Sequence, residues 1–201
     1  MTHTVDYYFT PQSPWTYLGH ARFSAIAKAA NARVRVLPVD LGGKVFPISG
    51  GLPLNQRAPQ RQAYRLVELK RFSDQLGLPL YLKPKHFPVA GDDASRLIIV
   101  VDQADGSDAA MALAAAVFRS VWVDELSIAD ADVLASLLGA AGLPASRIDA
   151  SRSAAVQQRY EANTQQAIDA GVFGAPSYVI DGEIFWGQDR LDFVARRLAQ
   201  P

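Results

Sequence analysis

The sequence predicts an α/β fold in which a strand–helix–strand unit opens the chain, a block of helices follows, and a strand–strand–helix unit closes it. Three observations predict this order. A short β-branched and aromatic run at 5–9 stops at Thr10-Pro11 and is followed by a helical pattern. Helical periodicity then dominates from about 58 to 168. Near the end, Asp181-Gly182 separates two β-prone runs, which is typical of a hairpin.

The helix of the opening unit has a strong start signal. Ser13 directly precedes Pro14, and a serine cap followed by proline at the first helical position favours a helix that begins there. His20 on this helix is expected to face solvent or to cap the packing. Residues 34–39 predict the second strand of a βαβ unit. The predicted buried face of the helix consists of apolar positions at three-to-four spacing: Leu18, Ala21, Ala25, Ile26 and Ala29.

The middle of the chain begins with a Gly- and Pro-rich stretch at 42–57, which predicts a long irregular loop of the kind that is usually functional or mobile. The first helix of the block ends at Gly77 and the last is closed by Gly171. The remaining predicted elements are helices containing 97–101, 109–123, 130–138 and 153–170, strands at 177–180 and 183–186, and a closing helix at 189–198.

Composition excludes several classes of function. The 201 residues include 20 Lys+Arg and 20 Asp+Glu, so the formal charge is zero and neither nucleic acid nor a membrane surface is an expected partner. The chain has no cysteine, which excludes disulfides, thiolate metal sites and a protein-borne thiol nucleophile. Its three histidines are scattered, so no metal is expected. No apolar run is long enough to span a bilayer and no signal peptide is recognisable, which favours the cytoplasm.

The predicted element order is the thioredoxin layout with helices inserted between its two halves. In redox proteins of that fold a Cys-x-x-Cys motif opens the first helix, where the helix N-terminus stabilises a thiolate. Here the corresponding residues are Ser13-Pro14-Trp15-Thr16, so hydroxyls replace the thiols and the dithiol reaction is impossible. Taken alone, a Ser-Pro pair favours the simpler interpretation, in which Ser13 is only a helix cap.

A second signal precedes the first strand of the closing unit. Gly174-Ala175-Pro176-Ser177 leads into that strand, and a proline at the first position of a strand cannot donate to the ladder. Pro176 is therefore either an ordinary trans strand-starter or the cis-proline that faces the first helix in thioredoxin-like folds. Asp189, at a helix start, could cap that helix or accept an ammonium group.

Two motifs together carry a resemblance to a known family. They are Tyr8-Phe9 with Ser13-Pro14-Trp15 and Tyr17-Leu18 near the start, and 171–176 with 182–191 near the end. The sequence resembles the 2-hydroxychromene-2-carboxylate isomerase family, a DsbA-like branch of the thioredoxin fold related to kappa-class glutathione transferases. The resemblance covers essentially the whole chain. It implies a single DsbA-like chain over 1–201, with a thioredoxin-like part at 1–41 and 171–201 and a helical insertion at about 42–170.

The resemblance also implies a glutathione site. Ser13 is similar to the residue that hydrogen-bonds the glutathione sulfur, and Ala175, before the cis-proline Pro176, to the residue whose backbone pairs with the cysteinyl part. Asn55 matches a position near glutathione and substrate. The segment that holds the γ-glutamyl end corresponds to Trp186, Gly187, Gln188 and Asp189.

Substrate contacts are implied in two further segments. Lys44 is similar to a lysine that faces the substrate carboxylate, although the spacing also allows Val45 or Phe46 at that position, and a solvated loop lysine is the other interpretation. Phe87 or the adjacent His86 corresponds to an aromatic residue that contacts the substrate.

The function implied is that of a glutathione-dependent isomerase. It would interconvert 2-hydroxychromene-2-carboxylate and trans-o-hydroxybenzylidenepyruvate, or a related aromatic-degradation intermediate, by reversible thiolate addition. Two alternatives stay open: a kappa-like glutathione transferase or peroxidase, and a non-catalytic thioredoxin-fold binding module. The expected partner is a small aromatic carboxylate, and a homodimer is an expectation from the resemblance alone.

Overall fold

The computed structural model of the chain describes residues 3–200 and contains a mixed four-stranded sheet in the order β2-β1-β3-β4. β1 (Thr4–Phe9) pairs with β2 (Arg33–Pro38) in parallel and with β3 (Ser177–Ile180) antiparallel. β3 and β4 (Glu183–Trp186) form the predicted hairpin. Asp181 and Gly182 both have positive φ, 50° and 83°, as a tight two-residue hairpin turn requires. The thioredoxin-like arrangement predicted from the sequence is confirmed.

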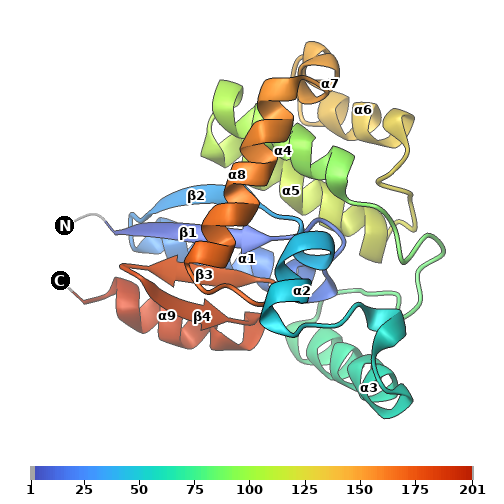
Figure 1. The fold of residues 1–201 in the computed structure, drawn as a ribbon, viewed down its shortest axis with the longest axis vertical. Coiled ribbons are helices and arrows are strands. Elements are labelled where there is room, and N and C mark those ends of the chain that lie inside the picture. The colour runs from blue at the N-terminus through green and yellow to red at the C-terminus, as the bar shows by residue number, and fades with distance from the viewer. Residues whose placement is uncertain (1–2, 201) are drawn as a thin grey trace.

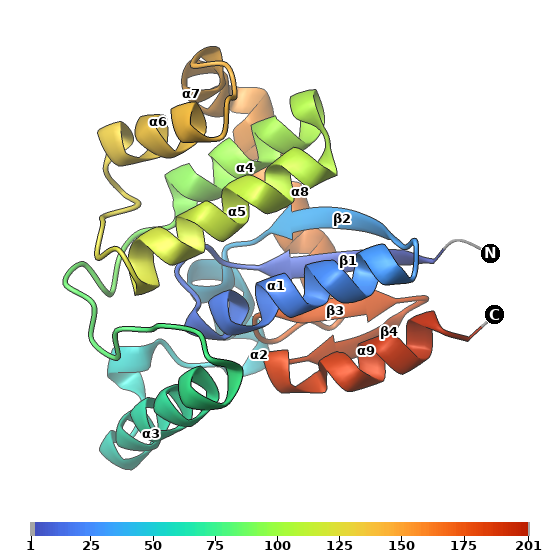
Figure 2. The same cartoon turned by 180° about the vertical axis from the view of Figure 1, so that it is seen from behind.

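The sheet is covered by helices on both faces. α8 (Ala154–Asp169) crosses one face (Figure 1), and α1 (Pro14–Ala29) and α9 (Leu191–Leu198) lie on the other (Figure 2). The helical insertion predicted over 42–170 therefore ends in a helix that packs directly on the sheet. This contact buries Ala167 of α8 together with Tyr8 of β1 and Val179 of β3.

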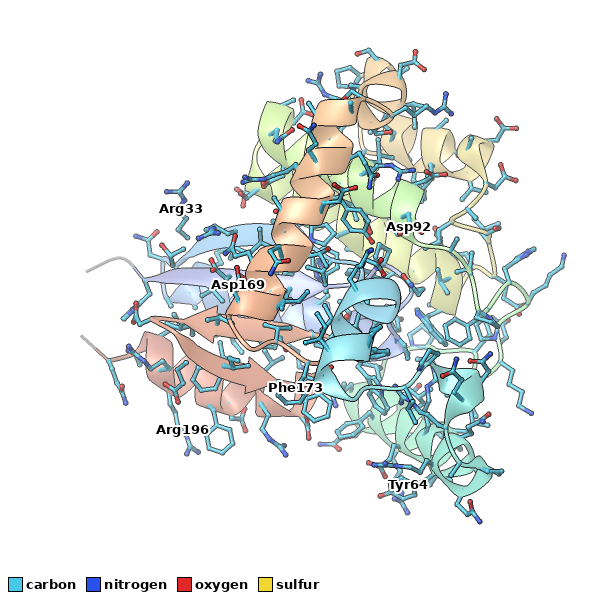
Figure 3. All side chains as sticks on the ribbon, viewed as in Figure 1. Arg33, Tyr64, Asp92, Asp169, Phe173 and Arg196 are labelled. Carbon is cyan, nitrogen blue, oxygen red and sulfur yellow. The ribbon has the colours of Figure 1, made fainter. Side chains whose placement is uncertain are left out.

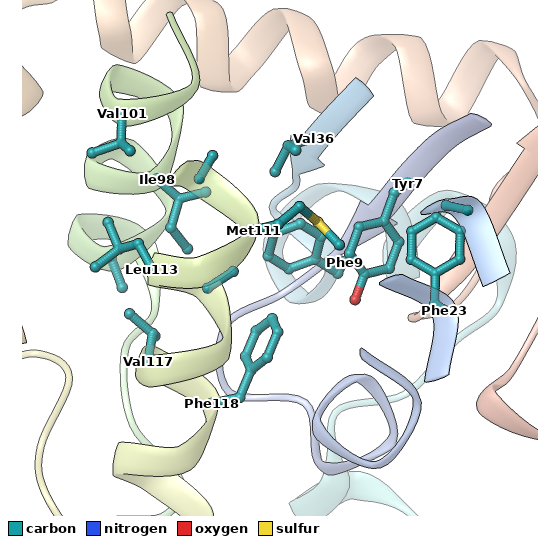
Figure 4. Packing of buried hydrophobic residues seen from close by; sticks show 14 of the residues in the cluster. Tyr7, Phe9, Phe23, Val36, Ile98, Val101, Met111, Leu113, Val117 and Phe118 are labelled. Atoms are coloured by element: carbon teal, nitrogen blue, oxygen red, sulfur yellow. The ribbon is translucent and has the colours of Figure 1, made fainter. Parts of the chain in front are cut away.

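The alternation of side chains along β1 divides the core between the two faces. Tyr7 and Phe9 point toward α1 and the helices beyond it, where they are fully buried (Figure 4). Val5 is fully buried in the same cluster. Tyr8 points to the opposite face, under α8. Since β1 is buried on both faces and paired on both edges, its C-terminal end is a rigid support for the start of α1.

The segment between β2 and β3 is mostly helical, as predicted, with two differences. Residues 42–57 are not irregular throughout, because they contain a π-helical turn at Leu41–Val45, α2 at Phe46–Ser49 and a 3₁₀ turn at Leu54–Gln56. These turns are too short to show apolar periodicity, and the first is fixed by the Asp40 carboxylate, which accepts from the Gly43 amide (2.7 Å). The helices that follow are α3 (Pro59–Leu76), α4 (Asp92–Asp105), α5 (Ser107–Trp122), α6 (Ala131–Ala140) and the unanticipated α7 (Ser146–Ser151).

The buried face of α1 differs from the predicted stripe. Leu18 is fully buried, but Ala21, Ala25 and Ala29 are exposed. The helix is instead packed through Gly19, His20, Phe23 and Ala27, because it is enclosed by the sheet, α5 and α9. None of the helices within residues 3–200 is both long enough and apolar enough to cross a membrane.

Candidate active site

Ser13 lies at the N-terminus of α1, immediately beyond the end of β1. Its amide donates to the Thr10 carbonyl (3.0 Å), and its hydroxyl oxygen accepts from the Thr16 amide (3.2 Å). The predicted N-cap role is thus confirmed. The hydroxyl proton of Ser13 has no acceptor among the described residues, so it is available to an incoming anion.

The first turn of α1 favours negative charge near Ser13. It contains no acidic side chain, and the positive end of the helix dipole and the first backbone amides point toward the cap. Thr16, at the position of the second cysteine of a redox motif, is fully buried, and its hydroxyl oxygen has no hydrogen-bond partner in the described part of the chain. Pro14 has no N–H and the Thr16 amide already donates to Ser13, so the turn offers an anion the Ser13 hydroxyl and the Trp15 amide, and no thiol.

The loop before β3 faces this turn because of the strand register. Tyr8 of β1 is paired with Ser177 of β3, so Ala175 and Pro176 lie beside the chain that connects β1 to Ser13. The Ala175–Pro176 peptide bond is cis, as the resemblance implied. Ala175 is buried, yet its backbone N–H and C=O have no hydrogen-bond partner within residues 3–200. Unpaired backbone groups beside a cis-proline are suited to pairing with a peptide-like ligand.

β4 closes the other side of this loop. The Gly187 amide donates to the Pro176 carbonyl (2.9 Å), and Gly187 has a φ of 107°, a conformation that favours glycine. The indole of Trp186 is half exposed and meets the Phe173 ring at a centroid distance of 4.8 Å. Figure 3 shows Phe173 at the end of the sheet where β1 ends and β3 begins. Two aromatic side chains therefore border the cis-proline loop on its solvent side.

Gln188 and Asp189 occupy different environments despite their adjacency. The Gln188 side chain is buried, and its amide oxygen and backbone carbonyl both accept from the guanidinium of Arg22 in α1. Its amide nitrogen has no partner in the described structure. Asp189 is exposed, and within residues 3–200 its carboxylate pairs only with the neighbouring Arg190 (2.6 Å). The Asp189 carboxylate is therefore accessible to a ligand, while the Gln188 side chain ties the turn to α1.

Asn55 and Lys44 lie in the segment between β2 and α3, and both are exposed. Lys44 lines a cavity of about 820 Å³ between the 41–49 segment, the start of α4 and α8. The lining of that cavity contains none of the other predicted site residues. The other charged side chains of its lining are four acidic residues, Asp40, Asp92, Asp93 and Glu161, and one basic residue, Arg96.

Phe87 lies half-buried in the segment between α3 and α4, next to the half-buried His86. The Phe87 ring packs against the indole of Trp122, with a centroid distance of 4.8 Å. The guanidinium of Arg65 lies over both rings, at 5.3 and 5.8 Å from their centroids. Arg65 and Trp122 were not predicted from the sequence, because they come from α3 and α5 and only the tertiary structure brings them together.

His20 is buried rather than facing solvent, so that expectation is wrong. Its Nε2 is 3.0 Å from the Met111 carbonyl oxygen, and its Nδ1 is 3.1 Å from the Tyr7 hydroxyl. Burial lowers the pKa of His20 to about 4. With a neutral ring, Nε2 donates to the carbonyl and Nδ1 accepts from the hydroxyl, which makes His20 part of the core between β1 and α5.

Comparisons with known proteins agree with the thioredoxin-like fold. The family described as DSBA-like thioredoxin domain matches residues 4–199. A 2-hydroxychromene-2-carboxylate isomerase from Sphingobium xenophagum is 29% identical over 195 residues, which cover 96% of this chain and 97% of that protein. One from Pseudomonas putida is 30% identical over 189 residues, covering 93% and 90%. A solved 2-hydroxychromene-2-carboxylate isomerase structure has a TM-score of 0.80 and 28% identity, covering 97% of this chain and 94% of the other.

Proposed function

The chain belongs to the 2-hydroxychromene-2-carboxylate isomerase family of DSBA-like thioredoxin-domain proteins, and we propose that it is a glutathione-dependent isomerase of 2-hydroxychromene-2-carboxylate or a related aromatic carboxylate. The observation that carries this proposal is the relationship between Ser13 and Ala175. A hydroxyl with a free proton lies at a helix N-terminus, and unpaired backbone groups lie on the facing loop. A chain without cysteine that keeps this arrangement is suited to a thiol brought by a cofactor.

The residues present fit glutathione. The unpaired N–H and C=O of Ala175 can pair with the cysteinyl unit, as adjacent strands pair. Asp189 is exposed and can accept the γ-glutamyl ammonium, and the Trp186 indole can cover the same end. Asn55, from the segment after β2, would complete the site. Gln188 would act by holding this turn against α1 through Arg22.

The free energy needed to lower the pKa of a thiol at Ser13 is moderate. A free thiol with a pKa of about 8.5 is only about 3% thiolate at pH 7. Lowering that pKa by about two units requires about 2.7 kcal/mol. The Ser13 hydroxyl, the Trp15 amide and the helix dipole together can supply this amount.

Bound in this way, glutathione would supply a thiolate that adds reversibly to a conjugated C=C bond of the substrate, which allows rotation about that bond before elimination. Ser13 would hold the sulfur as the anion by donating its proton in a hydrogen bond. The segments that carry Lys44 and Phe87 would contact the substrate, and Phe87 contributes an apolar surface for its ring.

The experiment that tests the proposal measures substrate conversion and glutathione concentration together. The proposal predicts that isomerisation requires glutathione and that the glutathione concentration stays constant over many turnovers. Stoichiometric loss of glutathione would indicate a transferase or peroxidase instead. Absence of glutathione binding at millimolar concentration would favour a non-catalytic binding module.

A further inference from the structure

Three arginines at the start of α3 and just before it have no acidic partner in the described structure. Five basic residues lie between 57 and 76, and the last two pair within the helix, Lys70 with Asp74 (2.8 Å) and Arg71 with Glu68 (2.7 Å). Among residues 3–200, no carboxylate oxygen lies within 4.0 Å of a side-chain nitrogen of the other three, which are Arg57, Arg61 and Arg65. Like charges this close in sequence repel each other, so this end of α3 carries uncompensated positive charge.

Arg65 is the inward-facing member of this group. Its guanidinium lies over the Phe87 and Trp122 rings and has no hydrogen-bond partner in the described residues. Burial, and then the charge of Arg57, lower the pKa of Arg65 to about 10. The aromatic faces offset part of the cost of burying this cation, but they leave its planar edge of N–H donors without an acceptor.

The position of Arg65 along α3 directs it toward the site at Ser13. Arg65 and Phe72 are seven residues apart, so they lie on the same face of the helix. The Phe72 ring meets the Trp15 ring edge-on, at a centroid distance of 6.0 Å and an interplanar angle of 90°. Trp15 follows Ser13 by two residues, so this face of α3 is turned to the first turn of α1.

The segment that carries Phe87 is held against the same turn at two points. At one end, the Tyr17 hydroxyl donates to the Pro79 carbonyl (2.7 Å). At the other end, the Gln12 side chain lies so close to Gly91 that a β-carbon there would overlap it. Phe87 lies in the segment between these two contacts, so Arg65 and its aromatic neighbours belong to the part of the insertion that packs against the first turn of α1.

Lys44 and the arginines Arg57 and Arg65 are in opposite electrostatic settings. Lys44 shares its cavity with four carboxylates, whereas no carboxylate of the described residues pairs with Arg65 or Arg57. Arg57 uses its Nε in a hydrogen bond to the Leu52 carbonyl (2.8 Å), and its terminal nitrogens have no partner within residues 3–200. A guanidinium also binds a carboxylate through two parallel hydrogen bonds, which an ammonium cannot do.

We propose that Arg65, assisted by Arg57, binds the carboxylate of an aromatic substrate whose ring packs on Phe87. The inference rests on the proposed function, because that function places the substrate at Ser13. It adds a specificity-determining residue on α3, a helix for which the sequence predicts no role in the site.

The test uses the full chain without glutathione and two matched probes, trans-2-hydroxycinnamate and its neutral primary amide. Binding is followed by calorimetry and by tryptophan fluorescence, to which Trp122 and Trp15 contribute. We expect wild type to prefer the carboxylate by about tenfold or more, the usual effect of one charge-assisted pair. Arg65→Met keeps an unbranched side chain over the rings and should reduce the preference to less than about twofold. Arg71→Met, on the paired outer side of α3, should keep the full preference.

Equal binding of the two probes by wild type, or an undiminished preference in folded Arg65→Met, would overturn the inference. Arg65→Gln serves the same comparison if the methionine variant does not fold. The inference and the proposed function fail separately. If wild type shows no glutathione-dependent isomerisation but Arg65→Met loses the carboxylate preference, the anion site is supported and the isomerase is rejected. Isomerisation with an unchanged KM in Arg65→Met would reject the anion site alone.

Discussion

The indole of Trp186 lies against Gly174 so closely that a β-carbon on Gly174 would overlap its Nε1. Gly174 immediately precedes Ala175, and Trp186 ends β4, so this contact joins the cis-proline loop to the turn that carries Asp189. The contact depends on the absence of a side chain at Gly174 rather than on a positive φ at that residue. It therefore provides a way to move the indole without altering the backbone.

Gly174→Ala should displace the indole and weaken glutathione roughly threefold to tenfold, the range for one lost aromatic contact. The free energy of unfolding should change by less than about 1 kcal/mol, because the indole is half exposed and free to swing. Calorimetric titration and urea unfolding measure the two quantities. Gly139→Ala, on α6 with open space around it, is the control and should leave glutathione affinity unchanged. Full affinity in Gly174→Ala would separate Trp186 from the cofactor.

Asp189→Ala should weaken glutathione by about 2 kcal/mol, which is the usual range for one charge-assisted pair. The reason is the proposed contact between its exposed carboxylate and the γ-glutamyl ammonium. Asp192→Ala, in the first turn of α9, removes an acidic residue from the same helix start and serves as the control. If both variants bind glutathione as wild type does, Asp189 only caps the turn.

Lys44 and Arg65 are two candidate cations for one substrate carboxylate, and their substitutions should differ in effect. Lys44 is exposed and surrounded by carboxylates, so Lys44→Ala should raise KM by less than about threefold, as for an exposed ion pair. Arg65→Met should raise KM by about tenfold or more, with glutathione affinity unchanged in both variants. Steady-state kinetics at saturating glutathione measure the two effects. The reverse order would assign the carboxylate to Lys44.

His20 predicts a loss of stability in mild acid. Its pKa is about 6.5 when unfolded and about 4 in the folded core, so between these values the unfolded chain binds a proton that the folded chain does not. The stabilising contribution is full above about pH 6.5 and decreases as pH falls toward 4. From pH 7.5 to 5 the free energy of unfolding should fall by about 2 kcal/mol from this group.

His20→Gln keeps an amide that can donate to the Met111 carbonyl but cannot titrate. Urea unfolding of both proteins at pH 7.5 and 5 should therefore show a smaller acid loss in the variant. An equal loss in the two proteins would mean that other groups cause the acid sensitivity.

The sequence was informative where structure is decided locally. Proline after a serine cap predicts the start of α1, and Asp181-Gly182 predicts the β3–β4 hairpin because its turn needs two residues that tolerate positive φ. The buried face of α1 was harder to predict, because small alanines give a weak periodic signal and the helix is enclosed on several sides. The burial of His20 also depends on tertiary structure, because its two hydrogen-bond partners come from β1 and α5.

The site residues also divide into those that a local sequence pattern predicts and those that only the tertiary structure brings together. Ser13 as the start of α1 follows from a short motif and the cis bond before Pro176 from the family resemblance, and the Tyr8–Ser177 register brings the two together. Arg65, Phe87 and Trp122 form one group although they lie on three separate segments, with 22 positions between the first two and 35 between the last two. No local pattern in a single sequence indicates such a group.

Ser13→Ala removes the hydroxyl that is proposed to stabilise the bound thiolate. One lost hydrogen bond to a charged acceptor is worth about 1.5–3 kcal/mol, or about one to two pKa units of the bound thiol. The tripeptide keeps its other partners, so glutathione affinity near pH 9 should stay within about 1 kcal/mol of wild type. Loss of the helix cap costs about 1 kcal/mol of stability by itself. Ser153→Ala removes a comparable cap, on α8, and is the matched control.

The most direct measurement is the ultraviolet absorbance of glutathione thiolate bound to wild type, Ser13→Ala and Ser153→Ala, titrated with pH and paired with isomerisation rates. Because the Ser13 hydroxyl is proposed to stabilise the thiolate, the titration midpoint of Ser13→Ala should be higher than that of wild type by about one to two pH units. Its rate at pH 7 should be at least about tenfold lower and should partly recover as pH rises, while Ser153→Ala follows wild type. Superimposable titration curves for wild type and Ser13→Ala would contradict the account and leave Ser13 as a helix cap.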